Sequence, residues 1–235
     1  MTSNCYTLWN IPTVRVTALN SCGVPVTGCS TVVSDGIISI EMTTEYEDRQ
    51  EFFVKNGDGR FCVRRTDPPI LKWINIVATF CNVDPELVNI MSAEPLVMDD
   101  AETPTAIGYS TDETSAGAAN FALEAWSRIA SDIPCTGGSE WGYTLLPWIV
   151  EGTVGDVTLE NGAANFVLNG RTSSLSGWGT GPYFVDYSDN PAGSTTPIAL
   201  LTPITSTQHR RMFITRLDPP TAACGCVDLD SLTPS

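Results

Sequence analysis

The sequence predicts a mainly β protein, a two-sheet β-sandwich or barrel with one short α-helix and with extended terminal arms and loops. Short runs of alternating apolar and polar residues, which are typical of half-buried strands, recur along residues 35–220. Gly, Pro, Asn and Asp fill the gaps between the runs, where they favour turns. Only one segment, beginning at Asp84, has the signals of a helix start. We therefore expect one β domain at 35–220, between an N-terminal arm at 1–34 and a C-terminal arm at 221–235.

The first strand of this domain follows a turn signal at Asp35-Gly36. Its residues alternate between apolar and polar, which predicts that one face packs on the core and the other faces water. The apolar face is Ile38, Ile40 and Met42, and the polar face is Ser39, Glu41, Thr43 and Glu45, extended by Glu47.

A β-hairpin is predicted next, from the runs at 51–55 and 60–66 on either side of Asn56-Gly57-Asp58-Gly59. Phe52 and Val54 lie on one side of the first run and Phe53 on the other. The sequence Asp67-Pro68-Pro69 ends the hairpin, because proline cannot donate to a strand ladder.

A long strand at 71–82 and a short helix follow. The strand places Ile74, Ile76, Ala78 and Phe80 on one face. Asp84 is a helix N-cap with Pro85 at the first helical position. The apolar residues of this helix are Leu87, Val88, Ile90 and Met91.

Several later segments complete the predicted sheets. The sequence Gly117–Leu123 recurs at Gly162–Leu168 with six of seven residues identical, and each copy opens a strand. Further strands are predicted at 141–150, 158–171 and 210–217, and a tight turn at 177–181 carries Trp178 as an aromatic plug. Residues 98–116 and 188–203 are expected to be loops.

The charge excludes a nucleic-acid-binding domain of the usual kind. The 27 acidic residues outnumber the 12 basic ones, so the chain carries −15 at pH 7 and its surface repels phosphate. The sequence has no run of 18 apolar residues, which would predict a transmembrane helix. It also shows no charged and apolar leader, which would predict secretion. We expect synthesis and assembly in a cytoplasm, with no membrane partner.

The sequence also argues against an enzyme and against a cofactor. The single histidine, His209, stands beside Arg210 and Arg211, where we expect a surface or interface residue. No Gly-x-Ser-x-Gly elbow and no phosphate-binding loop with lysine occurs. The acids of residues 98–116 lack the spacing of a calcium loop, so no metal site is predicted there.

The eight cysteines leave three interpretations open. In a cytosolic protein most are expected to be reduced. Cys62 and Cys81 lie in neighbouring predicted strands and could be close. Disulfides or a four-thiolate site remain possible for Cys22, Cys29, Cys224 and Cys226, provided that the two ends of the chain meet.

The order and spacing of several short motifs resemble those of the major tail tube proteins of long-tailed (siphovirus-type) bacteriophages, and the form in phages of actinobacteria most closely. The motifs run in chain order through Gly23-Val24-Pro25, Asp35-Gly36-Ile37, Asp84-Pro85-Glu86-Leu87, Phe121 to Trp126, Gly142-Tyr143 with Leu146-Pro147, Trp178 to Tyr183, Pro219-Pro220 and Gly225-Cys226. The resemblance covers the chain from Cys22 to Cys226.

The resemblance implies a structural virion protein of the tail tube fold. Such subunits form hexameric rings that stack into a tube, and genomic DNA passes down the channel without specific binding. The implied partners are further copies of the chain, the tape measure protein, and the tail tip and tail terminator proteins. The implied location is the tail of the virion, after assembly in the host cytoplasm.

Two surfaces are candidates for roles in such a tube. The polar face of the first strand (Ser39, Glu41, Thr43, Glu45, Glu47) is the candidate for the channel wall, although it could equally be an outer solvent face, and the strand at 71–82 competes through Asn75 and Thr79. The hairpin is the candidate for contact between rings, through Phe53, Lys55, Asn56, Asp58 and Arg60. The alternative for the hairpin is an ordinary surface loop, and the terminal arms are a second candidate for stacking.

Two other functions compete with the tube. One is a non-polymerising β-rich capsid decoration or adhesin-like virion protein, which would be a monomer or a trimer. The other is a secreted acidic hydrolase, which the absence of a leader sequence disfavours.

Overall fold

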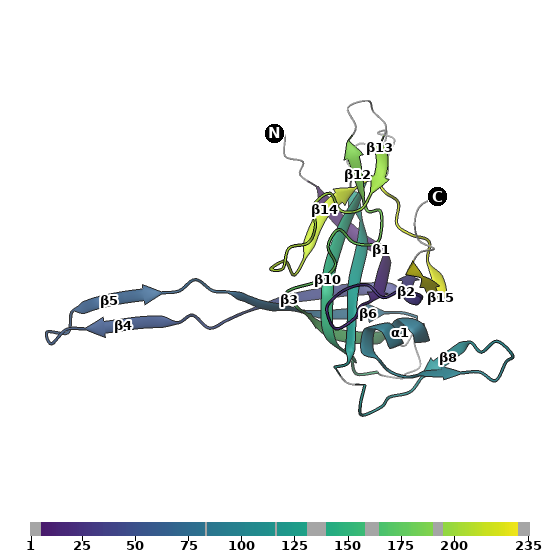
Figure 1. The fold of residues 1–235 in the computed structure, drawn as a ribbon, viewed down its shortest axis with the longest axis horizontal. Helices are drawn as coiled ribbons and strands as arrows, with labels where there is room; N and C mark the ends of the chain where they lie inside the picture. The colour runs from purple at the N-terminus through teal and green to yellow at the C-terminus, as the bar shows by residue number, and fades with distance from the viewer. Residues whose placement is uncertain are drawn as a thin grey trace.

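The computed structural model describes residues 6–82, 84–115, 117–130, 140–157, 165–189 and 195–229. Within these ranges the protein is mainly β with one short helix, which confirms the coarse fold class (Figure 1). The elements are β1 (Thr7–Ala18), β2 (Cys29–Ser34), β3 (Ile37–Tyr46), β4 (Glu51–Lys55), β5 (Phe61–Thr66), β6 (Leu71–Phe80), α1 (Pro85–Ser92), β7 (Leu96–Met98), β8 (Ala106–Tyr109), β9 (Ala119–Ala130), β10 (Trp141–Val154), β11 (Phe166–Thr172), β12 (Asp186–Asp189), β13 (Thr195–Ile198), β14 (Arg211–Thr215) and β15 (Ala223–Asp228).

One large antiparallel sheet dominates the described residues, instead of the predicted sandwich or closed barrel. Its order is β15-β2-β1-β9-β10-β11-β6-β3, and β14 also pairs with β10. The pairs β4-β5, β7-β8 and β12-β13 form three separate two-stranded sheets. The sheet branches at β10, because β14 pairs with Trp141–Leu145 and β11 pairs with the far end of the same strand. The register of β10 against β9 shifts between Leu146 and Ile149, on either side of Pro147.

The second half of β1 and most of β9 and β10 are buried on both faces. One face joins α1 and β6 in an apolar cluster that contains Val14, Ile76, Met91 and Phe121. The other face is covered by described residues of the segments 178–189 and 195–204, whose buried apolar side chains are Trp178, Tyr183, Val185, Leu200 and Ile204. The predicted aromatic plug is thus confirmed, since Trp178 is only 4% exposed.

Helix α1 begins as the sequence predicts. The Asp84 carboxylate accepts hydrogen bonds from the backbone N–H groups of Glu86 and Leu87, which satisfies two N–H groups that lack partners within the helix. The helix ends at Ala93 in the left-handed conformation (φ 60°). Leu87, Val88 and Met91 are buried under the sheet.

The strand β3 keeps its predicted alternation except at its start. Ile40 and Met42 pack against the core, whereas Ile38 is 50% exposed. A register shift between Ile37 and Ser39 turns Ile37 into the core in place of Ile38. A bulge of this kind inserts one residue and reverses the alternation on either side of it.

The terminal segments differ from the expected arms. Residues 7–18 and 29–34 form β1 and β2 inside the large sheet, and residues 223–228 form β15 on the edge of β2. The alternation in β1 is hard to recognise, because its second buried face carries Thr13, Arg15 and Thr17. Residues 1–5 and 230–235, also assigned to the arms, lie outside the described residues, as do the Asn161-Gly162 turn and the rest of 158–164.

Candidate assembly surfaces

The hairpin β4-β5 forms as predicted, and it extends away from the body of the protein (Figure 1). Every residue of both strands is exposed. Its large apolar side chains, which are Phe52, Phe53, Val54, Phe61 and Val63, are between 45% and 54% exposed. A two-stranded hairpin is marginally stable in water, so this segment presents apolar surface that its own chain does not cover.

Apolar and basic side chains alternate across both faces of this hairpin. On one face Phe53 pairs with Arg64 across the strands and Lys55 pairs with Phe61, and the rings of Phe53 and Phe61 are 5.7 Å apart. On the other face Phe52 pairs with Arg65, and Val54 pairs with Val63. In the loop, the Asn56 carboxamide accepts from the backbone N–H of Asp58 and Arg60 and so holds the turn. All five predicted stacking residues therefore lie on this exposed hairpin: Phe53, Lys55, Asn56, Asp58 and Arg60.

The two strands predicted to compete for the channel wall lie side by side. In the register of β3 with β6, Ser39 pairs with Thr79 and Thr43 pairs with Asn75. Directly paired residues share a face, so the two sets of polar residues form one surface. Glu41, Thr43, Glu45 and Glu47 are exposed on β3 and just after it, and Ser39 is half-buried.

This polar face of β3 and β6 continues onto β11. Arg171 pairs with Asn75 in the register of β11 with β6, and its guanidinium lies over the Trp73 ring at 4.6 Å. Arg171 also forms an ion pair with Glu151. The Asn75 carboxamide donates to Glu45 at 3.4 Å. The face is therefore acidic along β3 and becomes neutral towards β11.

A buried ion pair, which the sequence analysis did not predict, joins two central strands of the large sheet. The guanidinium of Arg15 on β1 makes two hydrogen bonds of 2.6 Å to the carboxylate of Glu124, its partner on β9. Both side chains are at most 4% exposed. The Tyr143 hydroxyl donates to the same carboxylate, and the Tyr183 ring lies 3.4 Å from the Arg15 guanidinium.

The charges of this pair balance each other inside the protein. Burial lowers the pKa of Arg15, but the Glu124 carboxylate more than offsets this, so that the pKa is raised. Burial and then the same carboxylate raise the pKa of Tyr143 well above its ordinary value. Since Tyr183 also hydrogen-bonds Thr17 and Thr31, the cluster fastens the segment around Tyr183 to β1 and β2. All four side chains of the cluster are at most 4% exposed, so it is a structural centre of the fold.

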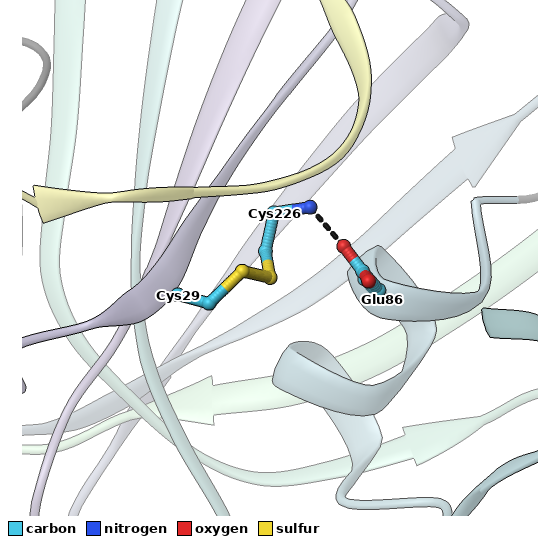
Figure 2. Close-up of side chains that lie close together, drawn as sticks. All are labelled: Cys29, Glu86 and Cys226. Carbon is cyan, nitrogen blue, oxygen red and sulfur yellow. Dashed lines mark hydrogen bonds between the residues drawn. A yellow bond between two sulfur atoms is a disulfide. The ribbon is translucent and has the colours of Figure 1, made fainter. Parts of the chain in front are cut away.

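The two ends of the chain meet at a disulfide between Cys29 on β2 and Cys226 on β15 (Figure 2). Helix α1 supports the same strand, since Glu86 accepts from the Cys226 N–H and Asp84 accepts from the Gly225 N–H at 2.8 Å. The ligand atoms of Cys29, Glu86 and Cys226 lie within 4.8 Å of one another. Only the reduced thiols could join Glu86 around a metal, and the disulfide removes that possibility.

The remaining cysteine predictions have mixed outcomes. The ends of the chain do meet, but Cys22 and Cys224 are free and exposed, so the four sulfurs form no common site. The predicted proximity of Cys62 and Cys81 is not supported by the pairing, because β5 pairs with β4, and β6 pairs with β3 and β11. Both of these thiols are free and exposed.

His209 is buried, which corrects the expectation that it lies at the surface. Its side chain is 6% exposed and its Nδ1 lies 2.8 Å from the Thr172 hydroxyl oxygen. That oxygen also accepts from the backbone N–H of Ile74. Burial lowers the pKa of His209, so the imidazole is neutral at pH 7, and the Thr172 hydroxyl links it to β6.

Among the described residues, no helix is long and apolar enough to cross a membrane. A comparison with models of known families finds no match, and a comparison with curated proteins finds no similar sequence.

Proposed function

We propose that this protein is the structural subunit of a phage tail tube, which self-assembles into stacked hexameric rings around a channel for DNA. The observation that carries the proposal is the hairpin β4-β5, whose apolar side chains are exposed on both faces. Such a ribbon gains stability only when another molecule covers it, and a self-assembling subunit supplies that molecule as a second copy.

The open sheet supports assembly in the plane of a ring. In the part of the chain that the structure describes, β3 is the last strand at one end of the large sheet and β15 the last at the other. Edge strands carry unpaired backbone N–H and C=O groups, which neighbouring subunits can pair. A ring of such subunits would join their sheets into one closed barrel. The number six, the tape measure protein and the tail tip and terminator proteins rest on the sequence resemblance alone.

The acidic surface of β3 suits the wall of a DNA channel. Glu41, Glu45 and Glu47 are exposed there, and the chain as a whole carries −15 at pH 7. Repulsion from phosphate is screened over about 8 Å at physiological salt, so that it acts only near the wall. A duplex would then pass without the salt-dependent attraction that basic residues produce.

Negative-stain electron microscopy of the purified protein, at low and high concentration, tests the assembly. We expect six-fold rings or hollow tubes of uniform width. A variant that lacks Asn56 to Gly59 should remain a folded monomer with an unchanged melting temperature and should form no tubes. Closed trimers would contradict the proposal and favour a capsid decoration or adhesin-like protein. Monomers at both concentrations would count against self-assembly.

The position of the channel wall has its own test. Tubes of the variant Glu41→Lys with Glu45→Lys should retain DNA at low salt and release it at high salt, whereas wild-type tubes should not retain it. Tubes that carry Asp156→Lys, at an exposed acid outside this face, are the control. A tube structure with Glu41 on the outer surface would overturn the assignment.

A further inference from the structure

A second projecting hairpin, β7-β8, lies at the end of the molecule opposite β4-β5, along its longest axis (Figure 1). The sequence analysis expected only a loop in this region. Three large apolar side chains of the β7-β8 hairpin, Val97, Met98 and Ile107, are 41% to 64% exposed. The molecule therefore has uncovered apolar surface at both ends.

The two hairpins carry opposite charges. Four of the 12 basic residues of the chain, Lys55, Arg60, Arg64 and Arg65, lie within residues 51–66. By contrast, no Lys or Arg occurs between Lys72 and Arg128. The region of β7-β8 within that interval bears Asp99, Asp100, Glu102, Asp112 and Glu113. Opposite charge beside apolar surface is the composition that an interface between two such ends requires.

Hydrogen bonds where β7-β8 joins the body of the protein and at its turn hold this acidic hairpin in a defined conformation. The buried Glu94 carboxylate accepts from the backbone N–H of Asp112, and the Asn89 carboxamide donates to the Glu94 carbonyl. At the turn, the Asp99 carboxylate accepts from the backbone N–H groups of Ala101 and Thr105. Asp99 and Asp112 thus maintain the loop, whereas Asp100 and Glu102 take no part in these turns and are exposed. The latter two are available to a partner.

We infer that the basic hairpin β4-β5 of one copy docks on the acidic hairpin β7-β8 of a second copy. The contact is heterologous, because it joins different surfaces at opposite ends, so it propagates from copy to copy and does not close a dimer. The inference deepens the proposed function and rests on it, since it names the surface that receives the stacking hairpin. Phe53 and Phe61 of one copy would cover Val97, Met98 and Ile107 of the next, with Arg60 and Arg64 near Asp100 and Glu102.

A charge-swap experiment by sedimentation velocity tests this docking. One variant carries Asp100→Lys with Glu102→Lys, and the other carries Arg60→Glu with Arg64→Glu. In each variant alone the substituted side chains have the same charge sign as the side chains that they would face, so we expect self-association to weaken by about tenfold or more. An equimolar mixture restores opposite charges at every contact and should associate as the wild type does. High salt should weaken both the mixture and the wild type.

The matched controls are Arg210→Glu and Asp156→Lys, which change exposed charges outside both hairpins and should leave association unchanged. If the wild type forms tubes and both swapped variants do so equally well, the docking inference fails and the proposed function stands. If the wild type forms only closed assemblies that the swap breaks and the mixture restores, the docking stands and the tube fails. If the Asp100→Lys, Glu102→Lys variant alone associates normally, β4-β5 binds elsewhere, which overturns the inference. Monomers in every sample would contradict both.

Discussion

The strand β9 and the hairpin β4-β5 both carry large apolar side chains on two faces, yet their surroundings are opposite. On β9, Phe121 and Leu123 are buried on one side and Trp126 on the other. On the hairpin, Phe52 and Phe53 point to opposite sides and both are about half exposed. The comparison teaches that an apolar pattern on two faces indicates two covering layers, and that those layers need not belong to the same chain.

The largest expected effect is the difference in unfolding free energy between matched substitutions in the two regions. Phe121→Ala leaves a cavity in a close-packed core and should lower the free energy of unfolding by about 4 kcal/mol. Phe53→Ala removes a ring that the monomer does not cover, so it should change that free energy by less than about 0.5 kcal/mol while impairing assembly. Urea denaturation of the monomers measures both. Equal destabilisation by the two substitutions would mean that the hairpin packs within its own chain.

The second face of β9 offers a test that concerns charge. Glu124→Gln leaves the Arg15 guanidinium buried without its counter-charge and should cost about 3 kcal/mol of unfolding free energy. The double variant Arg15→Met with Glu124→Leu removes both charges, and its loss should be smaller than that of Glu124→Gln alone. A comparison of the denaturation midpoints of Glu124→Gln and the double variant tests this expected order of stability. A double variant less stable than Glu124→Gln would show that the pair itself stabilises the fold.

The edge strand β15 is intermediate in burial between β9 and the hairpin, because it is only partly buried. Replacing Cys29 and Cys226 together by serine frees a link between residues 197 apart and should lower stability by about 2 kcal/mol. The hydrogen bonds from Asp84 and Glu86 remain. Denaturation with and without reductant measures the effect, and Cys62→Ser on the hairpin is the control with no expected change. If reductant leaves the wild type unaffected, the disulfide contributes nothing to its stability.

Local patterns predicted the local structure well. The hairpin around Asn56-Gly57-Asp58-Gly59, the helix cap at Asp84 and the buried face of β6 all follow from turn chemistry and alternation within a few residues. The coarse class, mainly β with one helix, follows from the number of such strands. The roles of the polar face and of the hairpin in a tube stay predictions.

Long-range pairing explains the misses in the large sheet. The predicted arm at 1–34 misses β1 because the segment shows no strong period, and only Glu124, 109 residues after Arg15, makes this arginine fit a buried face. The sheet is one layer that branches at β10, which no local signal indicates. The acidic segment at 98–116 was taken for a loop because its short strands contain few alternating residues. The misses at β1 and in the branched sheet therefore depend on partners that lie far away in the sequence, whereas the miss at 98–116 is local.

The smallest expected effect concerns His209, which is buried, unlike the residues of the hairpin. Because burial lowers its pKa in the folded protein, the unfolded chain, with a pKa near 6.5, binds a proton first as the pH falls. Stability should therefore be complete above about pH 6.5 and should decrease below it. In the tautomer with the proton on Nε2, the neutral Nδ1 accepts from the Thr172 hydroxyl, and protonation removes this acceptor. Urea denaturation at pH 7.5 and 5.5 should show a smaller difference for His209→Gln than for the wild type, whereas equal differences would place the pH dependence on the carboxylates.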